Sequence, residues 1–271
     1  SADCTKKITG GTVKSKLSIV KIGGNLIGNQ EALTYALELF SKVEGHKILV
    51  HGGGKKATEI SHLLGIESKI IQGRRITDAK SLEVAIMVYG GLINKTLVAQ
   101  LQGLGTNAIG MSGADANTIL AHRRPIKEVD FGYVGDVDTV NKKHIAQLLE
   151  AGFTPIFCAL THDGKGQLFN TNADTVAAEL AAGLAPIYET TLFYCFEKPG
   201  VLRNVSDEDS VIEHINSKKY EQLLEKNVIS DGMLPKMQNG FYALRHNVRQ
   251  VNIGNETMLS RIPLKYTRLT L

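Results

Sequence analysis

An apolar run that ends in three consecutive glycines constrains this chain more than any other feature. Residues 48–50 lead through His51 into Gly52, Gly53 and Gly54, and a segment of helical composition follows. The pattern predicts a buried strand that turns into a helix. Because glycine lacks a Cβ atom, the backbone at such a turn can approach a ligand closely, and the first N–H groups of the helix can bind an anion.

A second stretch repeats this arrangement nearer the start of the chain. The apolar run of residues 18–22 ends in Gly23 and Gly24, and Lys21 lies just before the turn. A tight turn with no ligand would explain one glycine pair, but two such turns favour a ligand. Open α/β folds bind ligands at the carboxyl ends of their parallel strands, so we expect both turns to line one cleft.

Strand and helix patterns alternate along the rest of the chain. Apolar or alternating stretches predict further strands at residues 107–111, 132–138, 154–160 and 191–196, with 250–253 as the last strand. Stripes of apolar residues at helical spacing separate them. Such alternation predicts an α/β fold with a mostly parallel sheet that is covered by helices on both faces.

The helix predicted at about residues 79–101 differs from the others. It is apolar on more than one face, and Gly90 and Gly91 lie in its middle. Each glycine costs a helix up to about 1 kcal/mol relative to alanine, so we expect a close packing contact to compensate. An all-round apolar helix with a small-residue spot favours a subunit interface.

Composition excludes several classes of protein. The net charge is +4, and the basic residues are scattered without aromatic neighbours, so we expect no nucleic-acid partner. No apolar run is long enough to span a bilayer, and we expect no membrane partner. The odd cysteine count without metal-ligand spacing favours small core residues, a reducing cytoplasmic location and no metal site. Residues 1–16 read as a polar N-terminal tail.

Six motifs in a fixed order carry a resemblance to a known family. They are Val20–Gly24, His51–Gly54, Gly73–Thr77, Val129–Gly135, Asn170–Asp174 and Asp231–Lys236. With these motifs the chain resembles the N-acetyl-L-glutamate kinases of the amino acid kinase superfamily. The resemblance implies a single domain over residues 1–271, folded as a three-layer αβα sandwich around about eight strands. It also implies an acyl-glutamate-binding and dimerisation half at 17–160, an ATP-binding half at 161–271, and a homodimer.

The reaction of that family explains which residue types it needs. A glutamyl carboxylate attacks the γ-phosphorus of ATP, and it is already ionised near neutral pH, so no general base is required. The obstacle is bringing one anion onto another, which calls for lysines, helix N-termini and a Mg²⁺ ion carried by the nucleotide. The resemblance assigns this catalytic role to Lys21 and Lys236, with Asp174 holding both lysines in orientation. An ordinary first-turn acid is the alternative interpretation of Asp174.

Binding residues follow from the same resemblance. Arg75 corresponds to the arginine that binds the α-carboxylate, Gly53 and Gly54 offer N–H groups to the side-chain carboxylate, and Asn170 offers an amide. His51 is interpreted as a structural hydrogen-bonding residue. The residues implied to bind ATP are Gly23, Gly24, Glu197, Lys198, Gly200 and Met233.

Departures from the family pattern leave alternatives open. Residues 195–200 are bulkier than usual and carry an extra cation, which keeps a non-catalytic nucleotide- or amino-acid-sensing protein possible. Unusual cations near the implied substrate side, at Lys55, Arg74 and residues 122–124, would suit a succinyl carboxylate. N-succinyl-L-glutamate is therefore the second substrate hypothesis, after N-acetyl-L-glutamate in arginine or ornithine biosynthesis.

Overall fold

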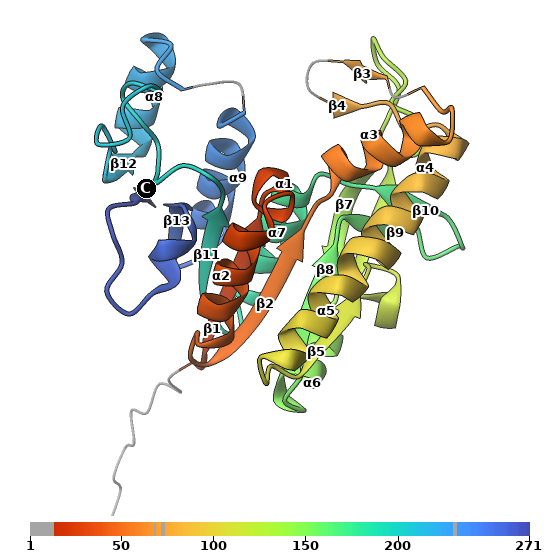
Figure 1. Cartoon of the computed structure of the whole chain (residues 1–271), viewed down its shortest axis with the longest axis horizontal. Coiled ribbons are helices and arrows are strands. Elements are labelled where there is room, and N and C mark those ends of the chain that lie inside the picture. Colours follow the sequence, from red (N-terminus) through yellow and green to blue (C-terminus); the bar gives the residue numbers. More distant parts are fainter. Residues whose placement is uncertain (1–13, 68, 72–73, 230–231) are drawn as a thin grey trace, which may run out of the picture.

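An eight-stranded sheet forms the centre of the computed structural model, which describes residues 14–67, 69–71, 74–229 and 232–271 (Figure 1). Neighbouring strands of this sheet run parallel except β13 and β14, which are antiparallel. In spatial order the strands are β12 (His214–Asn216), β14 (Thr267–Thr270), β13 (Gln250–Gly254), β11 (Glu189–Cys195), β1 (Lys16–Ile22), β2 (His46–His51), β8 (Thr154–Cys158) and β5 (Ala108–Met111).

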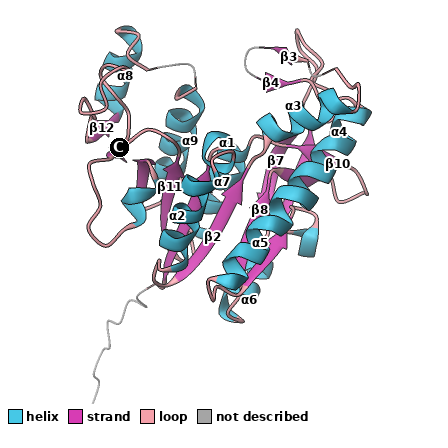
Figure 2. Cartoon of the chain, in the orientation of Figure 1, coloured by secondary structure: helices cyan, strands magenta, loops and turns pink. Residues whose placement is uncertain are grey.

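Helices cover both faces of this sheet and enclose two apolar cores. One face carries α6 (Lys142–Glu150), α7 (Ala173–Leu184) and α9 (Leu234–Arg245), and the other carries α2 (Gln30–Ser41), α4 (Ala79–Ala85) and α5 (Asn94–Gly103). Strand β1 serves both cores because its side chains alternate: Leu17 and Ile19 pack under α7, whereas Val20 and Ile22 pack under α2. The predicted three-layer α/β sandwich is confirmed (Figure 2).

Smaller elements extend the sandwich at the carboxyl ends of the central strands. A second sheet joins β10 (Leu168–Asn170), β9 (Leu160–His162), β6 (Ile119–Arg123) and β7 (Gly135–Val140), and a hairpin joins β3 (Ile70–Ile71) to β4 (Arg74–Arg75). Further helices are α1 (Gly24–Ile27), α3 (Gly54–Leu63), α8 (Ser217–Glu225) and the 3₁₀ turns η2 (Asp115–Asn117) and η3 (Glu256–Leu259).

The long central helix contains a π-helical segment, which was not predicted from the sequence. Between α4 and α5 the backbone forms a π-helical segment, η1 (Ile86–Ile93), and Asp78 caps the start of α4 by accepting from the Ser81 N–H. A Cβ atom on Gly90 would make only an ordinary 3.7 Å contact with Leu160, and one on Gly91 would meet nothing within 4 Å. The described residues therefore supply no close packing contact at these two glycines.

Several boundaries of the sequence prediction are wrong. The strand predicted at residues 132–138 runs over 135–140 as β7, and the one predicted at 154–160 divides into β8 and β9. Residues 250–253 are not the last strand, because β14 follows and pairs antiparallel with β13, with Val251 opposite Leu269. Strand β14 has only four residues, so its alternation of buried and exposed side chains is too short to mark a strand in the sequence. Its backbone hydrogen bonds come from β13, which is not adjacent in the chain. Lys16, which the sequence assigned to the polar tail, begins β1, while residues 1–13 of that tail lie outside the described residues.

Candidate active site

The two glycine turns lie side by side at one edge of the sheet. Strands β1 and β2 are parallel neighbours in which Ile22 pairs with His51, so the turns that follow them start level. Helices α1 and α3 begin there, at Gly24 and Gly54 (Figure 1). The expected meeting of the two turns at the carboxyl edge is therefore present.

Asp174 holds two lysines from distant parts of the chain. Its Oδ1 lies 2.8 Å from the Nζ of Lys21 on β1, and its Oδ2 accepts from the Nζ of Lys236 on α9 at 3.2 Å. All three side chains are nearly buried, with exposed fractions of 9% for Lys21, 13% for Lys236 and 7% for Asp174. The structure thus brings together the three residues that were assigned to catalysis.

The pKa shifts in this cluster follow from burial and charge. Burial raises the pKa of Asp174, but the ammonium groups of Lys21 and Lys236 more than offset this effect and hold it below the usual value. Burial lowers the pKa of Lys236, and the attraction of Asp174 only partly opposes it. The cluster carries two ammonium groups on one carboxylate, and this surplus of positive charge suits a phosphoryl group.

Local sequence explains why Asp174 lies where it does. Asn172 caps α7 by accepting from the Thr175 N–H, which places Asp174 in the first turn of that helix. The hydroxyl of Tyr194 on β11 donates to the backbone oxygen of Asp174 at 2.8 Å and fixes the turn to the sheet. On β1, Leu17, Ile19 and Lys21 share one face, so alternation directs Lys21 toward α7.

Arg75 lies against the second glycine turn. Its Nη2 donates to the Gly54 backbone oxygen at 3.0 Å and to the Thr58 hydroxyl at 2.5 Å, so the guanidinium sits over the start of α3. Gly53 precedes that helix with φ of +156°, and a Cβ atom there would lie 2.4 Å from the side chain of Ile93. Gly53, Gly54 and Arg75, which were all assigned to substrate binding, therefore lie next to one another in space.

Asn170 approaches the same region from β10. Its Nδ2 donates to the Thr77 hydroxyl at 3.1 Å, and its backbone N–H donates to the Tyr133 oxygen at 2.9 Å. Thr77 is fully buried and pairs with Gly132, where a Cβ atom would lie 2.2 Å from the Thr77 oxygen. This packing joins the segment after the β3–β4 hairpin to the motif at residues 129–135.

Several residues assigned to ATP line one small apolar pocket beside Lys236. The pocket has a volume of about 60 Å³, and its lining includes Phe196, Lys198, Gly200 and Met233. The Lys236 Nζ lies 5.9 Å from the centre of the Phe196 ring.

The first glycine turn contacts the same loop. The Gly23 N–H donates to the Cys195 oxygen at 2.9 Å, and Asn25, which follows Gly24, donates to Glu197 at 2.6 Å. Lys198 forms an exposed ion pair with Glu208 at 2.9 Å. Gly23, Gly24 and Glu197 thus lie together on the side of the cluster where Phe196 approaches Lys236.

His51 has the structural role that the sequence indicated. It is fully buried, its Nδ1 lies 2.8 Å from the Gly52 oxygen, and its Nε2 lies 3.0 Å from the Asn94 amide nitrogen. Burial lowers its pKa to about 4, so the ring is neutral at pH 7, with the proton on Nδ1. A ring whose two nitrogens are both engaged is not placed to take a proton from a substrate.

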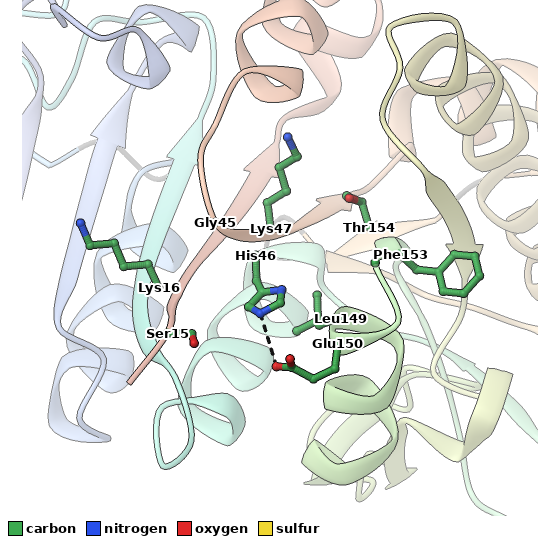
Figure 3. A pocket seen from close by; sticks show the side chains of 10 residues that line it. Ser15, Lys16, Gly45, His46, Lys47, Leu149, Glu150, Phe153 and Thr154 are labelled. Atoms are coloured by element: carbon green, nitrogen blue, oxygen red, sulfur yellow. Dashed lines mark ion pairs between the residues drawn. The ribbon is translucent and has the colours of Figure 1, made fainter. Parts of the chain in front are cut away.

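A larger pocket lies at the amino-terminal ends of the strands, opposite the glycine turns. Its volume is about 480 Å³, and it lies where β1, β2 and β8 begin (Figure 3). His46 and Glu150 approach to 3.3 Å inside it, while Lys47 points away and donates to the Ser41 and Val43 oxygens. The residues assigned to chemistry lie at the other end of the strands, so cavity size does not locate the site.

Sequence reasoning missed the residues that support this site. Tyr194, Thr77, Asn94 and Tyr89 are all buried and contact assigned residues or their turns. Tyr194 and Asn94 lie inside apolar runs, where a polar group needs a buried partner, and that was the available signal. Which partner each one finds depends on the tertiary fold.

Comparison with known proteins identifies what this chain is similar to. A model of the amino acid kinase family matches residues 16–255. A protein of Cytophaga hutchinsonii named acetylglutamate kinase is 54% identical over 239 residues, which cover 88% of this chain and 90% of that protein. One of the same name from Phocaeicola vulgatus is 51% identical over 241 residues, which cover 89% of this chain and 94% of that protein.

Solved structures share the fold. A protein of Streptococcus mutans has a TM-score of 0.78 at 26% identity and covers 94% of this chain and 98% of its own. The N-acetylglutamate synthase of Neisseria gonorrhoeae, solved with coenzyme A and N-acetyl-glutamate, has a TM-score of 0.79 at 20% identity over 95% of this chain and 59% of that one. At that identity, the likeness to the synthase shows the fold alone.

Proposed function

The chain belongs to the amino acid kinase family, and we propose that it is an acetylglutamate kinase in arginine biosynthesis. It phosphorylates the side-chain carboxylate of N-acetyl-L-glutamate with ATP and yields the acyl phosphate and ADP. The observation that carries this function is the buried Lys21–Asp174–Lys236 cluster beside two glycine turns. Relatives about half identical over most of the chain bear the same name.

The reaction needs no proton transfer. One oxygen of the ionised carboxylate forms a bond to the γ-phosphorus, while the bond from that phosphorus to the β,γ-bridging oxygen breaks and ADP leaves. Lys21 and Lys236 neutralise charge on the oxygens of the transferred group, and Asp174 keeps both ammonium groups in place. The neutral, buried His51 agrees with a mechanism that has no general base.

Substrate binding is assigned to the region of α3 and β10. Arg75 binds the α-carboxylate, the N–H groups of Gly53 and Gly54 bind the side-chain carboxylate, and Asn170 donates an amide hydrogen bond. The support is that Arg75 already contacts Gly54 at the start of α3, where free N–H groups and the helix dipole favour an anion.

Nucleotide binding is assigned to the region of α1 and the apolar pocket. Gly23 and Gly24 lie against the phosphates, and Gly200 and Met233 line the base pocket with Lys198, while Glu197 orients the loop through Asn25. Among the described residues, no group of three His, Cys, Asp or Glu side chains could hold a metal ion. Mg²⁺ usually keeps several waters and is bound by substrate phosphates with one or two carboxylates rather than by an all-protein cage, so it is assigned to the nucleotide phosphates.

The succinyl alternative is not favoured. The names of the relatives favour acetyl, and the basic run at residues 122–124 is occupied by acidic partners. These pairs are His122–Asp138 at 2.7 Å, Arg123–Asp130 at 3.0 Å and Arg124–Asp136 at 2.6 Å. Lys55 is exposed, and the side chain of Arg74 lies outside the described part of the chain. A sensing role is not favoured either, because both lysines and their aspartate are assembled.

A homodimer built on the central helix forms part of this proposal. The expectation that no apolar run is long enough to span a bilayer is wrong for residues 79–103, which are long and apolar enough by length and composition. Val84, Leu97 and Leu101 of this helix pack into the core. Met87 and Leu92 of the same helix are half-exposed, and this apolar surface suits a second copy of the chain. We expect the dimer to work in the cytoplasm without nucleic-acid or membrane partners. Light scattering of Leu92→Asp beside the parent chain tests the interface, and a parent monomer would refute it.

A coupled ADP-release assay tests the activity. With ATP and Mg²⁺, we expect rapid ADP release with N-acetyl-L-glutamate and little with glutamate or aspartate. N-succinyl-L-glutamate belongs in the same panel, and a clear preference for it in kcat/KM would replace the acetyl assignment. No release with any acyl-glutamate would refute the kinase function.

A further inference from the structure

Tyr89 lies between two parts of the proposed substrate site, the glycine turn before α3 and Arg75 on β4. It lies in the π-helical segment η1, and its side chain is buried, with 4% exposed. π-Helical segments inside α-helices are found frequently at functional sites.

The ring of Tyr89 packs against the second glycine turn. A Cβ atom on Gly53 would lie 3.0 and 3.2 Å from two ring carbons of Tyr89, tighter than ordinary side-chain contacts. Ile93, one turn further along η1, crowds the same position. The π-helical segment η1 thus packs the Tyr89 ring against Gly53, the residue that precedes α3.

The hydroxyl of Tyr89 reaches the other substrate-binding element. The guanidinium of Arg75 acts on this hydroxyl, because its charge and a hydrogen bond that it donates oppose the rise in the pKa of the phenol that burial causes. Arg75 also donates to the Gly54 oxygen and the Thr58 hydroxyl. A buried tyrosine hydroxyl requires a polar partner, and burial raises its pKa, so the phenol stays neutral at pH 7. Arg75 is in this way held from α3 on one side and from η1 on the other.

We propose that Tyr89 is a positioning residue for the acyl-glutamate, which fixes the Arg75 guanidinium relative to the Gly53–Gly54 turn. Its ring packs against the Gly53–Gly54 turn, and its hydroxyl contacts the Arg75 guanidinium. Tyr89 thereby fixes the distance between the two groups that bind the carboxylates of the substrate. The inference rests on the proposed function, since it takes Arg75 and the glycine turn as the substrate site. It assigns Tyr89 no contact with the reacting atoms.

The decisive variant is Tyr89→Phe, which keeps the ring against Gly53 and removes only the hydroxyl. We expect KM for N-acetyl-L-glutamate, and its Kd by calorimetry, to rise about three- to tenfold, the scale of one hydrogen bond. KM for ATP and kcat should change less than about twofold, and the melting temperature should stay close to the parent value. Tyr35→Phe, an exposed tyrosine on α2, is the matched control and should change none of these values.

A double variant separates positioning from general packing. If Tyr89 acts through Arg75, adding Tyr89→Phe to Arg75→Ala should weaken binding no further, because the guanidinium is already gone. Additive losses, or an unchanged Kd in Tyr89→Phe alone, would overturn the inference. The proposed function fails separately: a parent chain that binds N-acetyl-L-glutamate but releases no ADP refutes the kinase, while the Kd values still decide the role of Tyr89.

Discussion

The ammonium of Lys21 lies 2.8 Å from the carboxylate of Asp174, although one residue is on the central strand β1 and the other begins α7 across the sheet face. Lys236 shares the same carboxylate from a third element, α9. Burying a single ammonium would be costly, and the shared aspartate makes two of them stable beside an expected triphosphate. We therefore expect stability and the proposed catalysis to depend on the same three side chains.

Removing the Lys21 ammonium should reduce turnover. We expect Lys21→Ala to lower kcat by roughly 10²-fold or more, the scale for a preorganised charge lost from a transition state, with little change in KM for the acyl-glutamate. Steady-state ADP release measures both values. Lys16→Ala, at the exposed start of the same strand, is the control and should retain full activity. Near-normal kcat in Lys21→Ala would remove this lysine from the mechanism.

Removing the Asp174 charge should destabilise the fold as well as slow the reaction. In Asp174→Asn two nearly buried ammonium groups lose their anion, and breaking a buried ion pair in this way costs on the order of 3–5 kcal/mol. We expect a clearly lower melting temperature at pH 7, measured by calorimetry.

The pH dependence of that loss has a definite sign. Because the folded pKa of Asp174 lies below its unfolded value near 3.8, its contribution is complete above that value and is lost as the pH falls through the lowered folded pKa. The gap in melting temperature between the parent chain and Asp174→Asn should therefore narrow in acid. A gap that widens below pH 4 would contradict this account.

Arg75→Ala should affect one substrate only. We expect KM for N-acetyl-L-glutamate to rise at least tenfold, because a charge-assisted contact with the α-carboxylate is lost, while KM for ATP stays unchanged. Separate titrations of the two substrates give both constants. A rise confined to ATP would mean that the two halves of the site are assigned the wrong way round.

His51 should make the protein less stable in mild acid. Its folded pKa of about 4 lies below the unfolded value of 6.5, so the unfolded state binds the proton more readily, and stability falls as the pH drops from 6.5 toward 4. Urea unfolding of the parent chain at pH 7 and pH 5 measures the fall. In His51→Asn the loss over this interval should be smaller, and an equal loss would show that other groups cause it.

Local patterns in the sequence determined the elements and the chemistry they carry. Apolar runs before glycines marked β1 and β2, the acidic residue Asp174 was open to interpretation as a first-turn acid of a helix, and the order of six motifs indicated the family. These features depend on neighbours in the chain, through side-chain alternation, capping and the freedom of glycine, and a single sequence contains them.

Only the tertiary structure decided which side chains meet. The sequence contains Lys21, Asp174 and Lys236 but not their shared ion pairs, and it contains Tyr89 but not the turn of η1 that directs it to Gly53. Strand β14 was not predicted either, because the hydrogen bonds that define it come from its pairing with β13. Burial and long-range pairing arise when distant segments pack together, and that packing selects one partner among many that local pattern allows.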